Sequence, residues 1–326
     1  MTDLTHIEAF ILALGALGFG TIMLVKGGNW TIDAAVFIAR RFGVSPLVIG
    51  FTVVAFGTSL PELIVSVNAS LHGSPEIAVG NVLGSNIANI LLVAGAAGLF
   101  ATLTVPRGTL TRDLAAMIVA TAGLTALMLT GGIGRLAGGI MIGLLLLYVF
   151  WQYRMALREK TRAEDIENPV FISFPAAIVS LIGGLALIAL GAEFMVRGAT
   201  VSAEIIGVPE AVIGLSVIAL GTSLPELSTC VIAARRGQSD LILGNVIGSN
   251  VFNIMMILGA TALVRPVVTA DIAPQLVDLD IWVTLGVSIL FTIWLLIRHA
   301  IGRMTAFVFV GAYIAYVVGI YALYIG

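Results

Sequence analysis

One polar segment of this otherwise apolar chain occurs twice. Residues 50–99 contain the string GTSLPE and, further on, GNVLGSN, while residues 214–263 contain GTSLPE and GNVIGSN. Each position in the first copy corresponds to the position 164 residues further along, so that Thr58 matches Thr222 and Glu62 matches Glu226. Self-similarity of this kind indicates that the chain consists of two related halves.

Composition restricts the environment in which these halves fold. Of the 326 residues, 59% are hydrophobic and only 10% are charged, whereas soluble domains carry about 25% charged residues. We therefore expect a multi-pass membrane protein. An N-terminus with Asp3 and Glu8 in place of a basic region argues against a cleavable signal peptide. The single cysteine, Cys230, excludes an internal disulfide and a cysteine-based metal site.

Ten apolar stretches are long enough to cross a membrane as helices. The first and sixth exceed the ~20 residues that a span needs, so we expect both to be tilted. Two charges in the first span, Lys26 and Asp33, are expected to snorkel or to pair. We place the spans at residues 7–39, 44–69, 76–100, 113–130, 133–153, 171–203, 210–234, 240–263, 279–297 and 303–325.

Basic residues predict the orientation of the chain. With both termini outside, twelve lysines and arginines fall in inner loops and only two in outer loops, a strong positive-inside bias. Five spans per half is an odd number, so the second half enters the membrane in the opposite sense. The sequence thus predicts an inverted repeat of two five-helix halves, residues 1–153 and 170–326, joined by a charged inner linker at 154–169.

The repeated GTSLPE string interrupts the second and seventh spans in mid-membrane. Gly57 and Pro61 disfavour a continuous helix, and Ser59 with Glu62 has the spacing of a capping box that would start a new one. Backbone carbonyls before the break, near Ala55, would be freed. Broken helices at this depth are tolerated only where they are buried in protein or line a water-filled cavity.

The two halves together offer a set of oxygen ligands. Oxygens suit hard cations such as Ca²⁺, which takes about 6–8 of them, and the set has no histidine nitrogen or sulfur for zinc or copper. Two glutamates carry a charge of −2, so one Ca²⁺ or two Na⁺ would neutralise the site. An empty site would leave two like charges buried, which is costly. The set comprises Glu62, Glu226, Thr58, Thr222, Ser59, Ser223, Ser85, Ser249, Asn89 and Asn253.

Each of these residues also has a structural interpretation. A capping-box glutamate can serve the backbone alone, but a charge in mid-membrane costs on the order of 3 kcal/mol, and its symmetric occurrence favours ion binding. Asn89 and Asn253 can join helices by hydrogen bonds in place of binding an ion. We interpret Glu193 and Arg197 as a structural ion pair, because they lie four residues apart on one helix.

The paired strings resemble the α-repeats of the cation/calcium exchanger superfamily, specifically its Na⁺/Ca²⁺ exchanger-like members and their compact bacterial YrbG-like branch. The resemblance covers essentially the whole chain. It implies transport of Ca²⁺ against Na⁺ by alternating access, with spans one and six sliding over a rigid core. It also implies that Glu62 and Glu226 are shared central carboxylates, that the paired threonines and serines are hydroxyl ligands, and that Ala55 and Ala219 supply backbone carbonyls to flanking Na⁺ sites.

Two contrasts with that superfamily bear on the ions. Archaeal members and the K⁺-dependent branch carry an acid where this chain has Asn253, so the site here has two carboxylates and a K⁺ requirement is not expected. The proton-coupled branch has a characteristic glutamate after its Gly-Asn pair, and no glutamate follows Asn81 or Asn245.

We therefore expect a secondary active antiporter, not an enzyme, that extrudes Ca²⁺ in exchange for Na⁺ across a prokaryotic inner membrane. Its expected partners are the two ions and the bilayer, with no cofactor, no nucleic acid and no obligatory protein partner. Two alternatives stay open: a cation/H⁺ exchanger, in which the glutamates carry protons, and a passive cation channel. A membrane-embedded hydrolase is disfavoured because no histidine or lysine base accompanies Ser59 or Ser223.

Overall fold

The computed structural model describes residues 2–105, 110–159, 173–205 and 219–324, and most of them are helical. The helices of the first half are α1 (Thr2–Phe42), α2 (Pro46–Ile49), η1 (Gly50–Val54), α3 (Ala55–Thr58), α4 (Leu60–Leu71), α5 (Pro75–Ala88), η2 (Asn89–Val93), α6 (Ala94–Phe100), α7 (Thr111–Leu129) and α8 (Arg135–Glu159). Those of the second half are α9 (Phe174–Ile205), α11 (Ala219–Thr222), α12 (Leu224–Arg235), α13 (Ser239–Phe252), η4 (Asn253–Leu258), α14 (Gly259–Val264), η5 (Thr269–Asp271), η6 (Leu276–Asp280), α15 (Ile281–Arg298) and α16 (Arg303–Tyr324).

Most of the expected spans correspond to observed helices. Within the described residues, eight helices are long and apolar enough to cross a membrane, and the bent pair Pro46–Thr58 and Leu60–Leu71 is a ninth candidate. The longest two are Ile7–Phe42 and Phe174–Ile205, with 36 and 32 residues, in line with the long first and sixth apolar stretches. The expected span at 210–234 lies only partly within the described residues, where it comprises α11 and α12.

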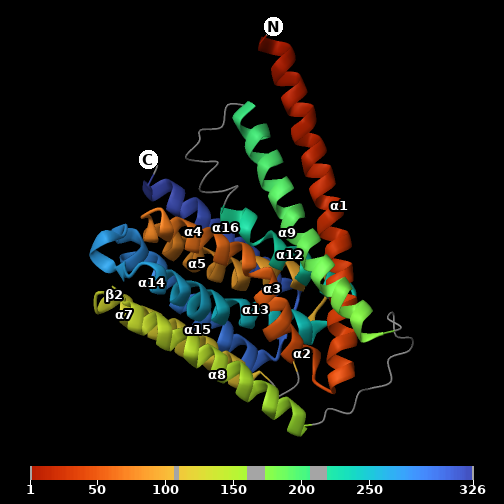
Figure 1. Cartoon of the computed structure of the whole chain (residues 1–326), viewed down its shortest axis with the longest axis vertical. Coiled ribbons are helices and arrows are strands. Elements are labelled where there is room, and N and C mark those ends of the chain that lie inside the picture. Colours follow the sequence, from red (N-terminus) through yellow and green to blue (C-terminus); the bar gives the residue numbers. More distant parts are fainter. Residues whose placement is uncertain (1, 106–109, 160–172, 206–218, 325–326) are drawn as a thin grey trace.

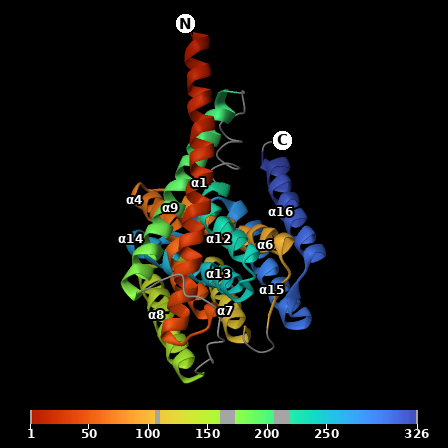
Figure 2. The same ribbon diagram turned by 90° about the vertical axis from the view of Figure 1, so that its right-hand side faces the viewer.

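Helices α1 and α9 lie side by side and cross the other helices steeply, and the N-terminal part of α1 extends beyond them (Figures 1 and 2). Glycines bring the two backbones into contact. A Cβ atom on Gly20 would lie 2.7 Å from the carbonyl oxygen of Gly191, and one on Gly27 would lie 2.6 Å from that of Gly184. The two contacts are equivalent in the repeat, because Gly20 matches Gly184 and Gly27 matches Gly191. Small residues allow this close approach in membranes.

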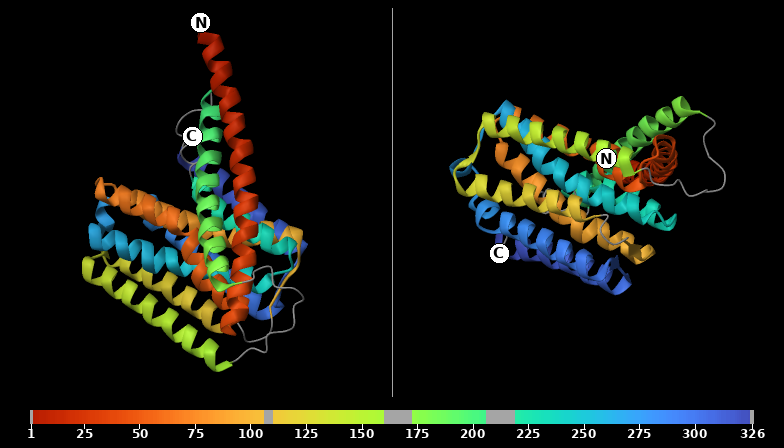
Figure 3. Two further views of the ribbon diagram at one scale, coloured as in Figure 1. Left: turned by 45° about the vertical axis from the view of Figure 1, so that its right-hand side comes forward. Right: turned by 90° about the horizontal axis from the view of Figure 1, so that it is seen from below.

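The remaining helices form a layered bundle beside this pair (Figure 3). Its centre is formed by α5 and α13 with the segments that continue them. In the most apolar part of Ser239–Val264, 89% of the residues are buried, and in that of Pro75–Phe100 the share is 72%, against at most 44% in the other single-helix spans of the described residues. Gly248 lets α13 touch η1, since a Cβ atom there would lie 2.4 Å from the carbonyl oxygen of Phe51.

Two short strand pairs, which an all-helical expectation did not include, join the halves. Strand β1 (Leu103–Thr104) pairs antiparallel with β4 (Ala300–Ile301), with Leu103 opposite Ile301. Strand β2 (Gly132–Ile133) pairs antiparallel with β3 (Val267–Val268), with Gly132 opposite Val268. Each pair therefore ties a loop of the first half to a loop of the second half.

A buried aspartate in each half accepts a hydrogen bond from a tyrosine on a helix further along the chain. Tyr148 of α8 donates to Asp113 of α7 at 2.6 Å, and Gln152 donates to the same oxygen at 2.8 Å. In the second half, Tyr316 of α16 donates to Asp280 at 3.0 Å. These hydrogen bonds satisfy the buried carboxylates and connect one helix to another.

Candidate ion-binding site

The repeated GTSLPE string interrupts the helix at the same place in each half. Helix α3 ends at Thr58 and α4 begins at Leu60, with a bend of 44° across Ser59. In the second half, α11 ends at Thr222 and α12 begins at Leu224. Proline accounts for both interruptions, because it has no N–H for the helical ladder but fits the first turn of the helix that restarts.

The capping box expected at Ser59 and Glu62 is not formed. Ser59 has φ −83° and ψ 4°, whereas a capping serine has an extended backbone, and its side chain makes no bond to α4. Its Oγ donates instead to Oε1 of Glu226 in the other half, at 3.3 Å. The carbonyl of Ala55, which we expected to be freed, accepts the backbone N–H of Ser59 at 3.0 Å.

The two repeated glutamates are almost completely buried, with exposed fractions of 0% for Glu62 and 1% for Glu226. Both carboxylate oxygens of Glu62, and Oε2 of Glu226, have no hydrogen-bond partner. No ion pair with either glutamate is found among the described residues. Buried carboxylates without partners are costly, so this arrangement suits a site whose charge is balanced by a bound cation.

Buried hydroxyl groups lie on the same repeated strings. The Oγ atoms of Ser85, Ser223 and Ser249 are buried and have no hydrogen-bond partner, so their lone pairs are available to a cation. The two threonines make hydrogen bonds across the halves. Thr58 Oγ1 lies 3.4 Å from Oδ1 of an asparagine of α13, and Thr222 Oγ1 donates to Oδ1 of an asparagine of α5 at 3.3 Å.

The expected amide ligands each begin a π-helical segment, Asn89 at η2 and Asn253 at η4. Such segments within helices frequently occur at functional sites. Neither polar side-chain atom of Asn89 has a partner, whereas Nδ2 of Asn253 donates to Oδ1 of Asn86 at 3.1 Å. This bond joins α5 to η4, as the structural interpretation expected, and it leaves Oδ1 of Asn253 available to a cation.

The remaining expected ligands are backbone carbonyls before the two breaks. Ala55 is the first residue of α3 and Ala219 is the first residue of α11, and the residues that precede Ala219 lie outside the described ranges. Within the part of the chain that the structure describes, no three His, Cys, Asp or Glu side chains lie close enough to hold a metal ion together. A cation bound here would therefore rely on two carboxylates and on neutral oxygens.

The two asparagines that bond to the threonines are Asn245 for Thr58 and Asn81 for Thr222. Our reading of the sequence assigned no role to either asparagine. The signal was present, because both occupy the second position of the repeated Gly-Asn strings. Spacing alone did not show that each side chain reaches the opposite half.

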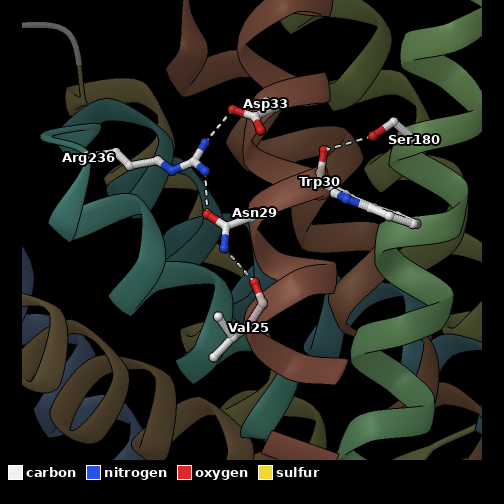
Figure 4. Close-up of polar contacts among 6 residues, drawn as sticks. All are labelled: Val25, Asn29, Trp30, Asp33, Ser180 and Arg236. Atoms are coloured by element: carbon white, nitrogen blue, oxygen red, sulfur yellow. Dashed lines mark hydrogen bonds and ion pairs between the residues drawn. The ribbon is translucent and has the colours of Figure 1, made fainter. Parts of the chain in front are cut away.

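A further polar cluster links α1 to the end of α12 (Figure 4). Arg236 donates to Oδ1 of Asp33 and to Oδ1 of Asn29, both on α1. Of the two charges expected to snorkel or pair, Lys26 is exposed and Asp33 pairs with Arg236 rather than with a residue of its own helix. This cluster lies outside the set of expected ligands.

Residues 12–154 and 176–322, most of the chain, match the model of the sodium/calcium exchanger protein family. The chain belongs to the sodium/calcium exchanger family. Relatives in this family include inner membrane protein YrbG of Escherichia coli K12, which is 37% identical over 290 residues, 87% of this chain and 88% of that protein. Another is the sodium/calcium exchanger MaX1 of Methanosarcina acetivorans, 31% identical over 345 residues, with coverage of 92% and 95%.

Solved structures of the sodium-calcium exchanger NCX_Mj share the fold of this family member. The structure soaked with zero Na⁺ and Ca²⁺ matches with a TM-score of 0.82 and 32% identity, over 95% of this chain and 99% of that one. This member of the exchanger family is thus an integral membrane protein and a cation/Ca²⁺ antiporter. Its relatives are exchangers and antiporters, which are transporters rather than enzymes.

Proposed function

We propose that this protein is a secondary active antiporter that exchanges Ca²⁺ for Na⁺ by alternating access and normally extrudes Ca²⁺. The observation that supports this proposal is the pair Glu62 and Glu226, two buried carboxylates from opposite halves. Three of their four carboxylate oxygens have no hydrogen-bond partner. Their combined charge matches one Ca²⁺ or two Na⁺. The relative MaX1 is named as a sodium/calcium exchanger, and NCX_Mj was soaked with Na⁺ and with Ca²⁺ or Sr²⁺.

The same pair accounts for coupling between the two ions. Without a cation, two like charges remain buried close together, and this raises the energy of the empty site. An empty site is therefore less able to pass through a closed intermediate than a site loaded with Ca²⁺ or Na⁺. Because the two ions compete for the same carboxylates, each passage carries one kind of ion, and the net result is exchange.

The neutral oxygens complete the coordination in this proposal. The glutamates are shared by all bound ions, hydroxyls and amides fill the remaining positions, and backbone carbonyls serve flanking Na⁺ sites. These oxygens exceed the roughly 6–8 that one Ca²⁺ takes, so some of them remain for the flanking Na⁺ sites. The hydroxyl and amide ligands are Thr58, Thr222, Ser59, Ser223, Ser85, Ser249, Asn89 and Asn253, and the carbonyls are those of Ala55 and Ala219.

The architecture that we propose around this site is an inverted repeat of ten spans. The broken second and seventh spans meet at the centre, the halves 1–153 and 170–326 are joined by an inner linker at 154–169, and both termini lie outside. The name of the relative YrbG supports an inner membrane location. In this proposal, helices α1 and α9 slide over the other helices during transport. They cross the bundle steeply and contact each other through glycine backbones.

Uptake of Ca²⁺ into Na⁺-loaded proteoliposomes, diluted into Na⁺-free medium, tests the coupling ion. We expect saturable uptake that requires internal Na⁺ and is unaffected by replacing K⁺ in the medium. Uptake without Na⁺ that follows an imposed pH gradient would instead show a cation/H⁺ exchanger, an alternative favoured by the unpartnered oxygens of Glu62, which can take up a proton. Uptake that needs no counter-ion and does not saturate would show a channel.

A further inference from the structure

Asn81 of α5 holds its side-chain amide between the two halves. Its Nδ2 lies 3.0 Å from Oγ of Ser66 and 3.4 Å from the backbone carbonyl oxygen of Glu62, both on α4 of the same half. Its Oδ1 accepts the hydroxyl proton of Thr222 in the other half, at 3.3 Å. The donor end of this amide is therefore fixed by its own half, and the acceptor end faces the opposite half.

Asn245 of α13 repeats this arrangement in the opposite direction. Its Nδ2 donates to Sγ of Cys230 on α12 at 3.3 Å, and its Oδ1 lies 3.4 Å from Oγ1 of Thr58. All three positions correspond in the repeat, because Asn245, Cys230 and Thr58 match Asn81, Ser66 and Thr222. At these positions sulfur replaces oxygen as the side-chain acceptor from the amide.

A threonine hydroxyl has one proton to donate and two lone pairs to share. When the proton is donated to an asparagine oxygen, the hydroxyl oxygen offers only lone pairs in its other directions, as a cation ligand must. Thr58 has two further acceptors within reach, the carbonyl oxygen of Ala55 at 3.4 Å and the carboxylate of Glu226. If both of these bind a cation, as proposed above, the proton of Thr58 is left to Asn245.

We propose that Asn81 and Asn245 are positioning residues that orient the hydroxyl of the ligand threonine in the opposite half. The inference rests on the proposed function, which makes Thr58 and Thr222 cation ligands. The inference is distinctive in that each asparagine acts across the two halves, Asn81 on Thr222 and Asn245 on Thr58. We call this relation the crossing. Each half thus prepares a ligand for the other half, in addition to supplying its own.

Double-mutant cycles on Ca²⁺ binding test the crossing. Ca²⁺ is titrated calorimetrically into the purified full-length protein in Na⁺-free buffer, for Asn81→Ala, Asn245→Ala, Thr222→Val, Thr58→Val and the four asparagine–threonine double variants. We expect each asparagine change to weaken binding about fivefold, the usual effect of one hydrogen bond, and each valine change, which also removes a ligand oxygen, to weaken it at least as much. The crossed doubles, N81A/T222V and N245A/T58V, should be little weaker than the matching valine variants. The same-half doubles, N81A/T58V and N245A/T222V, should be additive, about fivefold weaker than the matching valine variants.

Additivity in all four double variants would overturn the inference, and so would coupling confined to the same-half doubles. Thr222→Ser, which keeps the hydroxyl, should lie nearer to the parent than Thr222→Val; equal losses would show that packing matters and orientation does not. If an alanine variant does not fold, Asn81→Leu and Asn245→Leu, which conserve side-chain volume, are used in the same cycles. Asn68→Ala, at an exposed position of α4, is the control and should bind like the parent.

The two measurements, transport and binding, test the proposed exchange and the role of the asparagines separately. Proteoliposomes without Na⁺-driven uptake would overturn the proposed exchange while the binding cycles could still show the crossing. Normal uptake with additive cycles would retain the proposed exchange and remove the role of the asparagines. A parent that binds neither Ca²⁺ nor Na⁺ would overturn both.

Discussion

Glu62 and Glu226 provide the negative charge of the proposed site, and each is needed for a divalent ion. In Glu62→Gln and Glu226→Gln the site is one charge short, so we expect each variant to lose Na⁺-dependent Ca²⁺ uptake at least about 100-fold, as for removal of one buried charge partner. Rates of initial uptake in proteoliposomes measure this. Glu193→Gln is the matched control, because Glu193 forms the expected ion pair with Arg197 at 2.5 Å and is 56% exposed. Uptake at the parental rate in either site variant would refute the site.

Asn253 is the position at which a third carboxylate would enter the site. In Asn253→Asp the bond from Nδ2 to Asn86 is lost, because two acceptor oxygens then face each other, and a negative charge is added to the proposed site. We expect the half-saturating Na⁺ concentration to change by about fivefold or more, or the pH dependence of uptake to shift, while Ca²⁺ binding is retained. Measured Na⁺ and pH profiles that coincide with those of the parent would place Asn253 outside the site. Asn68→Asp controls for an added surface charge.

The burial of most of the proposed ligand residues was predictable from the sequence, but the contacts that they make were not. Two buried copies of a string rich in hydroxyls, amides and carboxylates indicate an oxygen site wherever they meet. Spacing describes contacts within one helical turn, which is why it suggested that Ser59 caps α4. In the structure Ser59 bonds to Glu226, 167 residues away, and the asparagine–threonine bonds span similar distances along the chain. Such contacts depend on how the halves pack.

Among the helices, α1 and α9 depend on glycine at their crossing points. A methyl group on Gly27 would lie 2.6 Å from a backbone oxygen of Gly184 and 2.9 Å from the backbone nitrogen of Ile188, and neither backbone atom can move aside alone. We expect Gly27→Ala to destabilise the purified protein by about 1–3 kcal/mol, seen as a lower midpoint of thermal unfolding. In Gly18→Ala the new methyl group has no atom within 4 Å, so this control should keep the parental midpoint. Equal midpoints in both variants would contradict the contact.

The ion pair between Asp33 and Arg236 ties α1 to the end of α12 outside the site. Its side chains are 24% and 34% exposed, so the pair contributes at most ~1 kcal/mol. We expect Asp33→Asn to change the maximal uptake rate by no more than about fivefold, and to leave the half-saturating Ca²⁺ concentration unaltered. Lys26→Gln, at an exposed position of the same helix, should change neither quantity. A shift in half-saturating Ca²⁺ for Asp33→Asn would mean that the pair belongs to the site.

Most of the membrane-spanning helices in the described residues were predictable from the sequence, because lipid requires long apolar stretches with internally bonded backbones. The links between helices were not predictable in the same way. The partner of Asp33, the tyrosine bonds to Asp113 and Asp280, and the strand pairs β1–β4 and β2–β3 all depend on which loops and helix ends come together. The periodicity of the sequence does not indicate which of these segments are neighbours in the structure.

For the molecule as a whole, the contacts between halves predict that neither half works alone. The bond from Ser59 to Glu226, the asparagine–threonine bonds and both strand pairs cross between them. We expect residues 1–159 and 160–326, produced as separate chains in one cell, to restore Na⁺-dependent uptake to within about tenfold of the intact protein, because the linker carries none of these contacts. Each fragment by itself should give none, and co-purification through a tag on one fragment measures assembly. Uptake by a single fragment would refute a site shared between halves.

The crossed bonds also limit how a protein of this kind can originate. In the inverted repeat that we propose, a single half made as a separate polypeptide would acquire a complete site only by meeting a second copy of itself inserted upside down. Both orientations would then have to be produced in similar numbers, and its loops would need nearly balanced lysine and arginine. Joining the copies removes that requirement. In the orientation that we propose, twelve basic residues lie on one side and two on the other. These are the loop charges expected of a protein whose second half no longer selects its own orientation.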